Sequence, residues 1–157
     1  MKLQLWSIGK NHEPYVQEGV ELFTRRIKHY FPVEWKLIPP PKNTASLPEA
    51  ELKKKEGEAV LELLGKDDFL ILLDEKGKLL SSPETATLLQ KKADSGTRNL
   101  VFLIGGAFGV SETVRQRAGL VWSFSPLVFP HQLMRLMLAE QLYRACSILN
   151  KEKYHHS

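Results

Sequence analysis

His131 and Arg135 are the two side chains whose types and spacing best suit chemistry. They stand four residues apart, so a helix would carry both on one face of its first turns. Taken singly, each is more readily explained by a structural role. As a pair beside a ligand-binding loop, they could bind a phosphate or polarise a heterocyclic base. The residues alone leave both interpretations open.

A glycine-rich turn is the second candidate, in the segment LIGGAFG at 103–109. Gly105 and Gly106 follow a predicted strand, and ligands of open parallel sheets bind beyond the carboxyl ends of strands. Glycines there let the backbone approach a ligand and expose bare N–H groups. The spacing GGxxG matches neither the GxGxxG dinucleotide fingerprint nor the GxxxxGK[ST] phosphate loop. On this motif alone, a plain turn explains the glycines at least as well as a ligand loop.

Two further strand ends would lie beside Gly105 if the three buried strands are neighbours. One is Leu73, at the end of the apolar run 69–73. The other is the stretch made of Phe124, Ser125, Pro126, Leu127, Val128 and Phe129. Together these ends would form an apolar slot walled by backbone. Such a slot suits adenine, which main-chain donors and acceptors can bind between aliphatic side chains.

Alternating strands and helices are predicted to position these residues. Apolar periodicity predicts strands at 3–8, 33–38, 69–73, 100–104 and 120–124, and helices at 13–30, 48–64, 82–93, from 111, and at 130–149. Ser82 is expected to be the N-cap of the third helix, with Pro83 as its first helical residue. The alternation predicts an α/β fold, a mostly parallel sheet with helices on both faces, in a single domain over 1–157.

The last predicted helix, 130–149, carries apolar residues around nearly its whole circumference. A surface helix would show one apolar stripe, so this helix should be buried on two sides. One side would be its own sheet and the other a second copy of the chain, which predicts a two-fold homodimer. A central core helix of a monomer is the alternative. Glu140 and Arg144, four apart, predict an ordinary intrahelical ion pair.

The overall composition is typical of a soluble globular chain of 157 residues with a net charge of +4. That mild excess permits a polyanionic partner without requiring one. Cys146 is the single cysteine, which excludes an intrachain disulfide and a multi-thiolate metal site. His12 and His29 have no partners at metal-ligand spacing, so both are expected on the surface and no metal is expected. With no membrane-length apolar run and no signal peptide at the start, a cytoplasmic protein without a membrane partner is expected.

Three separated segments resemble one known family. LIGGAFG, SFSPLVFPHQLMRLMLAEQLYRA and the closing KYHHS are similar to the bacterial large-subunit rRNA pseudouridine N3-methyltransferases, the RlmH family of the SPOUT, or α/β-knot, superfamily. The start, MKLQLWSIGK, and the segment KEGEAVL are similar too. The resemblance therefore extends from the first strand to the last residues.

The resemblance implies a fold, a donor and a reaction. The fold would be a homodimer whose C-terminal half is tied in a deep trefoil knot, a feature that ordinary topology rules disfavour. The methyl donor S-adenosylmethionine would contact Leu73, Gly105 and 124–129. The methyl group would pass to N3 of a pseudouridine in 23S rRNA within the ribosome, with no metal required.

The same resemblance suggests roles for individual residues. His131 and Arg135 would contact a phosphate or the carbonyl oxygens of the base, and Tyr154 and His155 would close over the target from the tail. The proton acceptor stays open. His156 stands where the family tail tends to have a basic residue. Candidate phosphate contacts are Lys53, Lys54, Lys55, Arg25, Arg26 and Lys28, although a solvated helix face is the preferred explanation of the lysine run.

Three alternatives remain at this stage. Another SPOUT enzyme would methylate a tRNA or a different rRNA base. A non-catalytic ribosome-binding factor would keep the fold without the chemistry, although the intact glycines and PHQLMR segment argue against that. A flavin- or nucleotide-binding α/β protein of doubly wound topology is the third, because such folds host many functions.

Overall fold

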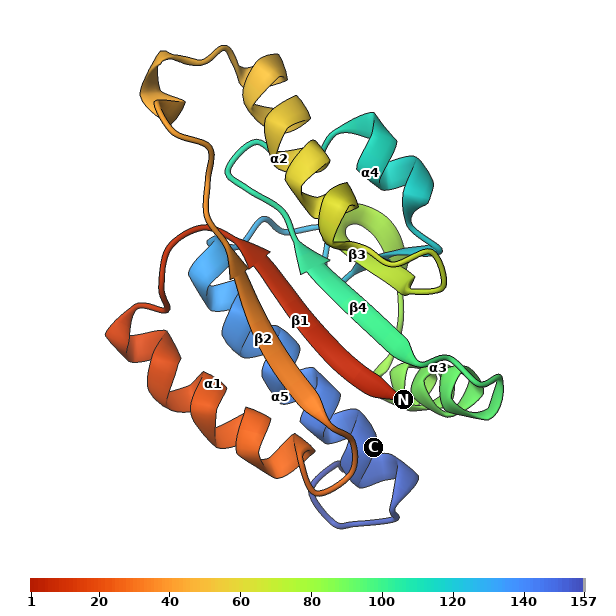
Figure 1. The fold of residues 1–157 in the computed structure, drawn as a ribbon. Coiled ribbons are helices and arrows are strands. Elements are labelled where there is room, and N and C mark those ends of the chain that lie inside the picture. Colours follow the sequence, from red (N-terminus) through yellow and green to blue (C-terminus); the bar gives the residue numbers. More distant parts are fainter. Residues whose placement is uncertain (157) are drawn as a thin grey trace.

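The computed structural model describes residues 1–156 and shows alternating strands and helices (Figure 1). Ser157, the end of the predicted tail, lies outside the described residues. The strands are β1 (Lys2–Ile8), β2 (Val33–Ile38), β3 (Phe69–Leu79), β4 (Asn99–Ile104) and β5 (Leu120–Ser123). The helices are α1 (Pro14–Ile27), a 3₁₀ turn η1 (Thr44–Ser46), α2 (Glu49–Leu63), α3 (Ser82–Asp94), α4 (Glu112–Arg117) and α5 (His131–Leu149).

The sheet has the strand order β2-β1-β4-β3-β5, and every pair in it is parallel. All carboxyl ends therefore meet at one edge, where loops from distant parts of the sequence become neighbours. The side chains of β4 alternate between the two faces, as the period of a strand requires. Phe102 faces the core cluster on the side of α1, α3 and α5, and Leu103 faces the cluster on the side of α2 and α4. The predicted α/β fold, with a parallel sheet covered on both faces, is confirmed.

β3 differs from the prediction, which ended it at Leu73. The strand continues to Leu79, after a shift in its register against β5 between Leu73 and Lys78. The polar residues 74–76 concealed this extension, because periodicity identifies a strand only where apolar side chains recur. Smaller differences lie at element ends, since β5 stops at Ser123 and α1 at Ile27.

The start of α3 also corrects the prediction by one residue. Ser81, rather than Ser82, is the N-cap: its hydroxyl accepts a hydrogen bond from the backbone N–H of Glu84. The Glu84 carboxylate in turn accepts one from the backbone N–H of Ser81, which completes a capping box. Because Pro83 lacks a backbone N–H, it fits the first turn of the helix in either register.

α5 lies between α1 and α3 against the sheet and holds the largest share of the core on that face (Figure 1). Arg135, Leu138, Ala139, Leu142, Ala145, Cys146 and Ser147 form its buried stripe. Its other large apolar residues, such as Leu133 and Met137, are only half-buried in the single chain. The predicted ion pair between Glu140 and Arg144 is confirmed.

None of the helices formed by residues 1–156 combines the length and the apolar character that crossing a lipid bilayer requires.

Candidate active site

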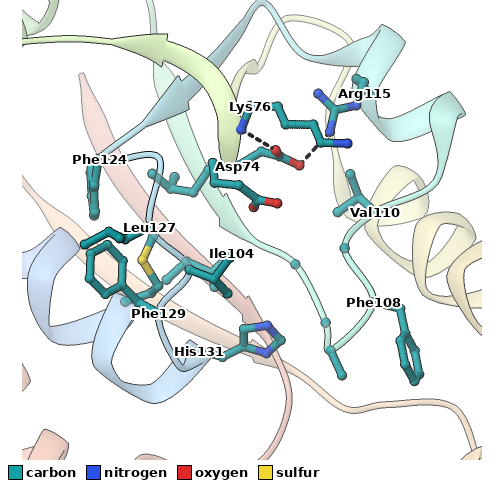
Figure 2. Close-up of a pocket in the computed structure, with 18 of the residues that line it drawn as sticks. Asp74, Lys76, Ile104, Phe108, Val110, Arg115, Phe124, Leu127, Phe129 and His131 are labelled. Carbon is teal, nitrogen blue, oxygen red and sulfur yellow. Dashed lines mark hydrogen bonds and ion pairs between the residues drawn. The ribbon is translucent and has the colours of Figure 1, made fainter.

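The ends of β3, β4 and β5 surround one pocket with a volume of about 420 Å³ (Figure 2). The predicted donor-contacting residues that line it are Leu73, Gly105, Phe124, Ser125, Leu127, Val128 and Phe129. Pro126 is exposed and is not among the lining residues. The structure thus brings the three predicted strand ends together, and their role as donor contacts stays a prediction. We call this cavity the strand-end pocket.

One wall of the strand-end pocket is apolar. Figure 2 shows the side chains of Ile104, Phe124, Leu127 and Phe129 gathered on this side. The opposite wall is the backbone turn 105–110. This turn is closed by a hydrogen bond that the N–H of Gly109 donates to the carbonyl of Gly106, at 3.1 Å. Apolar side chains facing bare backbone are the combination that a planar heterocycle requires.

The other end of the strand-end pocket is charged. The Asp74 carboxylate accepts hydrogen bonds from Nη2 of Arg115, at 2.5 Å, and from the backbone N–H of Lys76, at 2.8 Å (Figure 2). The contact between Asp74 and Arg115 joins the extended part of β3 to α4, so both elements hold the rim of the pocket. Lys53 also lines this pocket and is half-buried, unlike the exposed Lys54 and Lys55.

His131 opens α5 and lines the strand-end pocket across from Asp74 (Figure 2). Burial lowers the pKa of its imidazole below the ordinary value of 6.5, and the positive charge of Arg135 lowers it further. The ring is therefore neutral at physiological pH. A neutral imidazole can accept a hydrogen bond or a proton.

Arg135 is on the same face of α5 but does not line the strand-end pocket. Its side chain is 1% exposed, and it holds the loop that follows β1. Nε donates to the hydroxyl of Ser7 at 2.9 Å, and Nη1 donates to the carbonyl of Lys10 at 2.8 Å. The two residues of the predicted pair therefore occupy different places: His131 lines the pocket, and Arg135 lies behind it.

His12 differs from the prediction of a surface residue. It is half-buried, with Nδ1 3.3 Å from Nη1 of Arg135 and its ring 5.1 Å from that of Trp35. Burial and the charge of Arg135 lower its pKa, and Glu21 opposes them. Sequence spacing could not reveal this contact, because its partner lies 123 positions away. His29 is exposed, as predicted.

The tail residues Tyr154 and His155 fold onto the far end of their own α5. The Tyr154 hydroxyl donates to Oε1 of Glu140 at 3.0 Å, and His155 Nδ1 lies 3.3 Å from Nη1 of Arg144. α5 has 19 residues, so it is roughly 28 Å long. The structure therefore does not bring the tail to the strand-end pocket of the same chain.

Glu56 is a residue of this region that the sequence analysis missed. It is 7% exposed, and both carboxylate oxygens lie 2.7 Å from where a Cβ on Gly106 would be. Burial raises the pKa of its carboxyl group. A signal was present, because Leu52, Glu56 and Val60 recur every four residues along the buried stripe of α2.

Three comparisons with known proteins bear on the family. The family model described as a predicted SPOUT methyltransferase matches residues 1–155. A ribosomal RNA large subunit methyltransferase H of Cytophaga hutchinsonii is 49% identical over 156 residues, covering 99% of this chain and 100% of that one. The protein of the same name from Parabacteroides distasonis is 45% identical, with 99% of both chains covered.

A solved structure of a probable methyltransferase from Bordetella pertussis Tohama I is similar with a TM-score of 0.56 and 16% identity, covering 92% of this chain and 95% of that chain. At that identity it supports the fold alone. The family match and the two relatives span nearly the whole chain and agree with each other. The chain belongs to the SPOUT methyltransferases and, within them, to the family of ribosomal RNA large subunit methyltransferase H.

Proposed function

We propose that this chain methylates N3 of a pseudouridine in 23S rRNA on the ribosome, with S-adenosylmethionine as methyl donor. We also propose that it acts in the cytoplasm and that residues 1–157 form a single domain. The observation that carries the proposal is the 49% identity, along nearly the whole chain, to a relative named for methylation of large-subunit ribosomal RNA. The mild positive charge of the chain is compatible with an RNA partner.

The strand-end pocket fits the donor. Its volume of about 420 Å³ lies within the range of small-molecule sites. Leu73 and the stretch 124–129 would hold the adenosine, and Gly105 would offer bare backbone. When bound, the donor supplies an electrophilic methyl group on a sulfonium, so the residues need only position the target and remove its proton. We propose no metal in this reaction. By family membership we also infer that the loops around this pocket belong to a deep trefoil knot.

His131 is our candidate for the proton acceptor. As the bond from N3 to the methyl carbon forms, the carbon–sulfur bond breaks and the sulfur leaves as a neutral thioether. The N3 proton must go to a base, and a neutral imidazole can take it. His131 lines the strand-end pocket and is neutral for the reasons given above. Arg135, four residues along, supplies a fixed positive charge next to it.

We propose a homodimer in which each tail serves the partner's pocket. The half-buried apolar residues of α5 and the exposed side chains of Leu127 (68%) and Val128 (80%) support a second copy on this face. Because α5 separates Tyr154 and His155 from the pocket of their own chain, they reach a target only from the other copy. His155→Ala should then lower turnover while leaving donor binding intact, as measured by calorimetry and methyl transfer. Unchanged turnover would remove the tail from the mechanism.

Exposed cations are proposed to contact rRNA phosphates. Arg25, Lys28, Lys54 and Lys55 are exposed. Arg26 is occupied in part, with its guanidinium 5.3 Å from the ring centre of Tyr143. Phosphate contacts release counterions, so affinity for ribosomes should fall steeply as salt rises. A flat dependence between low and moderate salt would remove this assignment.

The first experiment is transfer of a labelled methyl group from S-adenosylmethionine to ribosomes, free rRNA and bulk tRNA from a strain that lacks the endogenous activity. We expect label in ribosomes, mapped to an N3-methylpseudouridine. Label in tRNA would keep the chemistry and change the substrate. Donor binding without label in any of the three would overturn the proposed reaction and favour a ribosome-binding factor.

A further inference from the structure

A second cavity adjoins the strand-end pocket and is not explained by donor binding. It is lined by 8–13, Tyr15, Ala107, 129–132 and Arg135, with a volume of about 820 Å³. We call it the β1-loop recess. Ala107, Phe129 and His131 line both cavities, so a ligand in the recess would lie beside one in the strand-end pocket. His131 is the titratable side chain that borders both.

The floor of the β1-loop recess carries the buried positive charge of Arg135, and Glu13, which also lines the recess, is the acidic group that acts on it. Arg135 is 1% exposed and forms no ion pair with residues 1–156. Nε and Nη1 are occupied by Ser7 and Lys10, whereas Nη2 has no hydrogen-bond partner among those residues. A Cβ at Gly9 would lie 3.0 Å from Nη2, so the absence of a side chain there keeps this donor uncovered. Nη2 is therefore open to the recess, where it can donate to water or to an acceptor on a ligand.

Two imidazoles are neighbours of the Arg135 side chain. His12 lies 3.3 Å from Nη1 of Arg135, and His131 stands one helical turn before Arg135 on α5. The loop that carries His12 is fixed in place: Gln132 Oε1 accepts from the backbone N–H of Glu13, and Gln132 Nε2 donates to the carbonyl of Asn11. The recess thus offers one charged donor and two rings that can accept or donate, all held by the fold.

Tyr15 adds an aromatic surface at the edge of the recess. It lies in the first turn of α1, and 59% of its side chain is exposed. A phosphate would need no such ring, whereas a nucleobase stacks on exposed aromatic side chains. The edge of a pyrimidine around N3 presents a carbonyl, an N–H and a second carbonyl. A guanidinium donor and a neutral imidazole complement that pattern.

We propose that the β1-loop recess binds the target pyrimidine, with Tyr15 stacked on the base and Arg135 and His12 hydrogen-bonded to its edge around N3. The proposal rests on the proposed function and identifies where the acceptor base lies relative to the donor. In this arrangement N3 faces His131 at the border of the two cavities. The positive charge of Arg135 stabilises the negative charge that the base gains as its proton leaves.

Tyr15 and His12 are the residues to change, because neither is in the fully buried core. Tyr15→Ala and His12→Ala should each lower kcat/KM for ribosome methylation by roughly tenfold, the loss expected for a missing base stack or for a base edge left without its hydrogen-bond partner. Tyr15→Phe, which keeps the ring, should stay close to the wild type, as should His29→Ala. Donor affinity measured by calorimetry and oligomeric state measured by sedimentation should be unchanged in all four.

Wild-type kcat/KM in both Tyr15→Ala and His12→Ala would overturn the proposal while leaving the proposed function intact. Equal loss of donor affinity, or a change of oligomeric state, would also overturn it, since the recess would then serve the donor or the dimer. If the wild type itself fails to methylate ribosomes, uridine 5′-monophosphate can be titrated into the protein bound to S-adenosylhomocysteine. The imidazole NMR signals of His12 and His131 should then shift, and that of His29 should not. Signals that stay in place would exclude a base from the recess.

Discussion

At the residue scale, burial and one arginine together disfavour the charged form of two histidines. Burial and the guanidinium of Arg135 both lower the pKa of His12 and of His131. Each ring is therefore neutral in the folded protein at a pH where an exposed histidine is partly protonated. The site thus has two neutral imidazoles close to its positive charge, one on the same turn of α5 as Arg135 and one in the loop that follows β1.

This arrangement predicts that stability falls as the pH drops below 6.5. In that range the unfolded chain binds protons that the folded chain excludes from His12 and His131, so protonation favours unfolding; well above 6.5 neither state binds them. Urea denaturation at pH 7.5 and at pH 5.5 should show a loss in the wild type and a smaller loss in His12→Gln. His29→Gln, at an exposed position, should behave as the wild type does. An equal loss in His12→Gln would show that His12 does not contribute.

A second prediction at this scale concerns Glu56, whose pKa burial raises. A raised pKa means that the carboxylate costs stability once it is charged, so the cost is absent at low pH and grows as the pH rises through the folded pKa. Glu56→Gln should therefore raise Tm at pH 8, by roughly 2–4 °C for each kcal/mol regained. The gain should vanish at pH 4, and Glu58→Gln, an exposed neighbour on α2, should show none. A fall in Tm at pH 8 would mean that the charged carboxylate is stabilised in the fold.

At the element scale, the strand-end pocket depends on how β3 meets β5. The two strands pair up to Leu73, lose register, and pair again from Lys78. The segment between the two pairings carries Asp74 to the pocket rim, where it binds Arg115. Irregular pairing at a sheet edge is thus what turns polar side chains toward the candidate site.

Gly77→Ala tests this element. A Cβ at residue 77 would lie 2.6 Å from the carbonyl oxygen of Val121 and 2.8 Å from the backbone nitrogen of Trp122. Both contacts are backbone, which cannot rotate away, so the two strands must separate. The free energy of unfolding should fall by about 1–3 kcal/mol, and affinity for S-adenosylmethionine should fall with it. Lys78→Ala, at an exposed position on the same segment, is the control; equal effects of the two variants would contradict the steric explanation.

The elements also show what the sequence could predict. Apolar periodicity identified each strand and α-helix but not the 3₁₀ turn η1. The rule that ligands bind at the carboxyl ends of parallel strands brought Leu73, Gly105 and all of 124–129 except Pro126 to one pocket. The extension of β3 was missed because 74–76 are polar. His12 was misplaced because its environment is made by Arg135, far along the chain. Such long-range contacts depend on the order of the strands in the sheet, and local sequence patterns do not reveal that order.

At the scale of the whole molecule, the length of α5 separates two parts of the candidate site. His131 stands at one end of the helix, and the contacts of Tyr154 and His155 with Glu140 and Arg144 hold the tail near the other. Figure 1 shows α5 starting near the carboxyl ends of the strands and running back along the sheet to the C-terminus. A two-fold axis perpendicular to α5 and close to its middle would place each tail near the pocket of the other copy.

Mixed dimers test this arrangement directly. His131→Ala removes the proposed proton acceptor, and His155→Ala removes the tail contact, so each variant alone should be nearly inactive. In a dimer of the two, the intact pocket of the His155→Ala chain receives the intact tail of the His131→Ala chain. Random exchange of subunits should therefore restore about a quarter of the wild-type rate, because half of the dimers are mixed and each has one complete site.

The control is the same mixture held under conditions in which subunits do not exchange, and it should stay inactive. If exchange restores nothing while sedimentation shows mixed dimers, the tail does not complete the partner's site. His155→Ala alone then distinguishes the remaining cases: a variant that is still inactive points to a tail that acts on its own pocket after leaving Glu140 and Arg144. If the variant is active, the tail takes no part in the reaction. The target site then consists of His131 and the β1-loop recess.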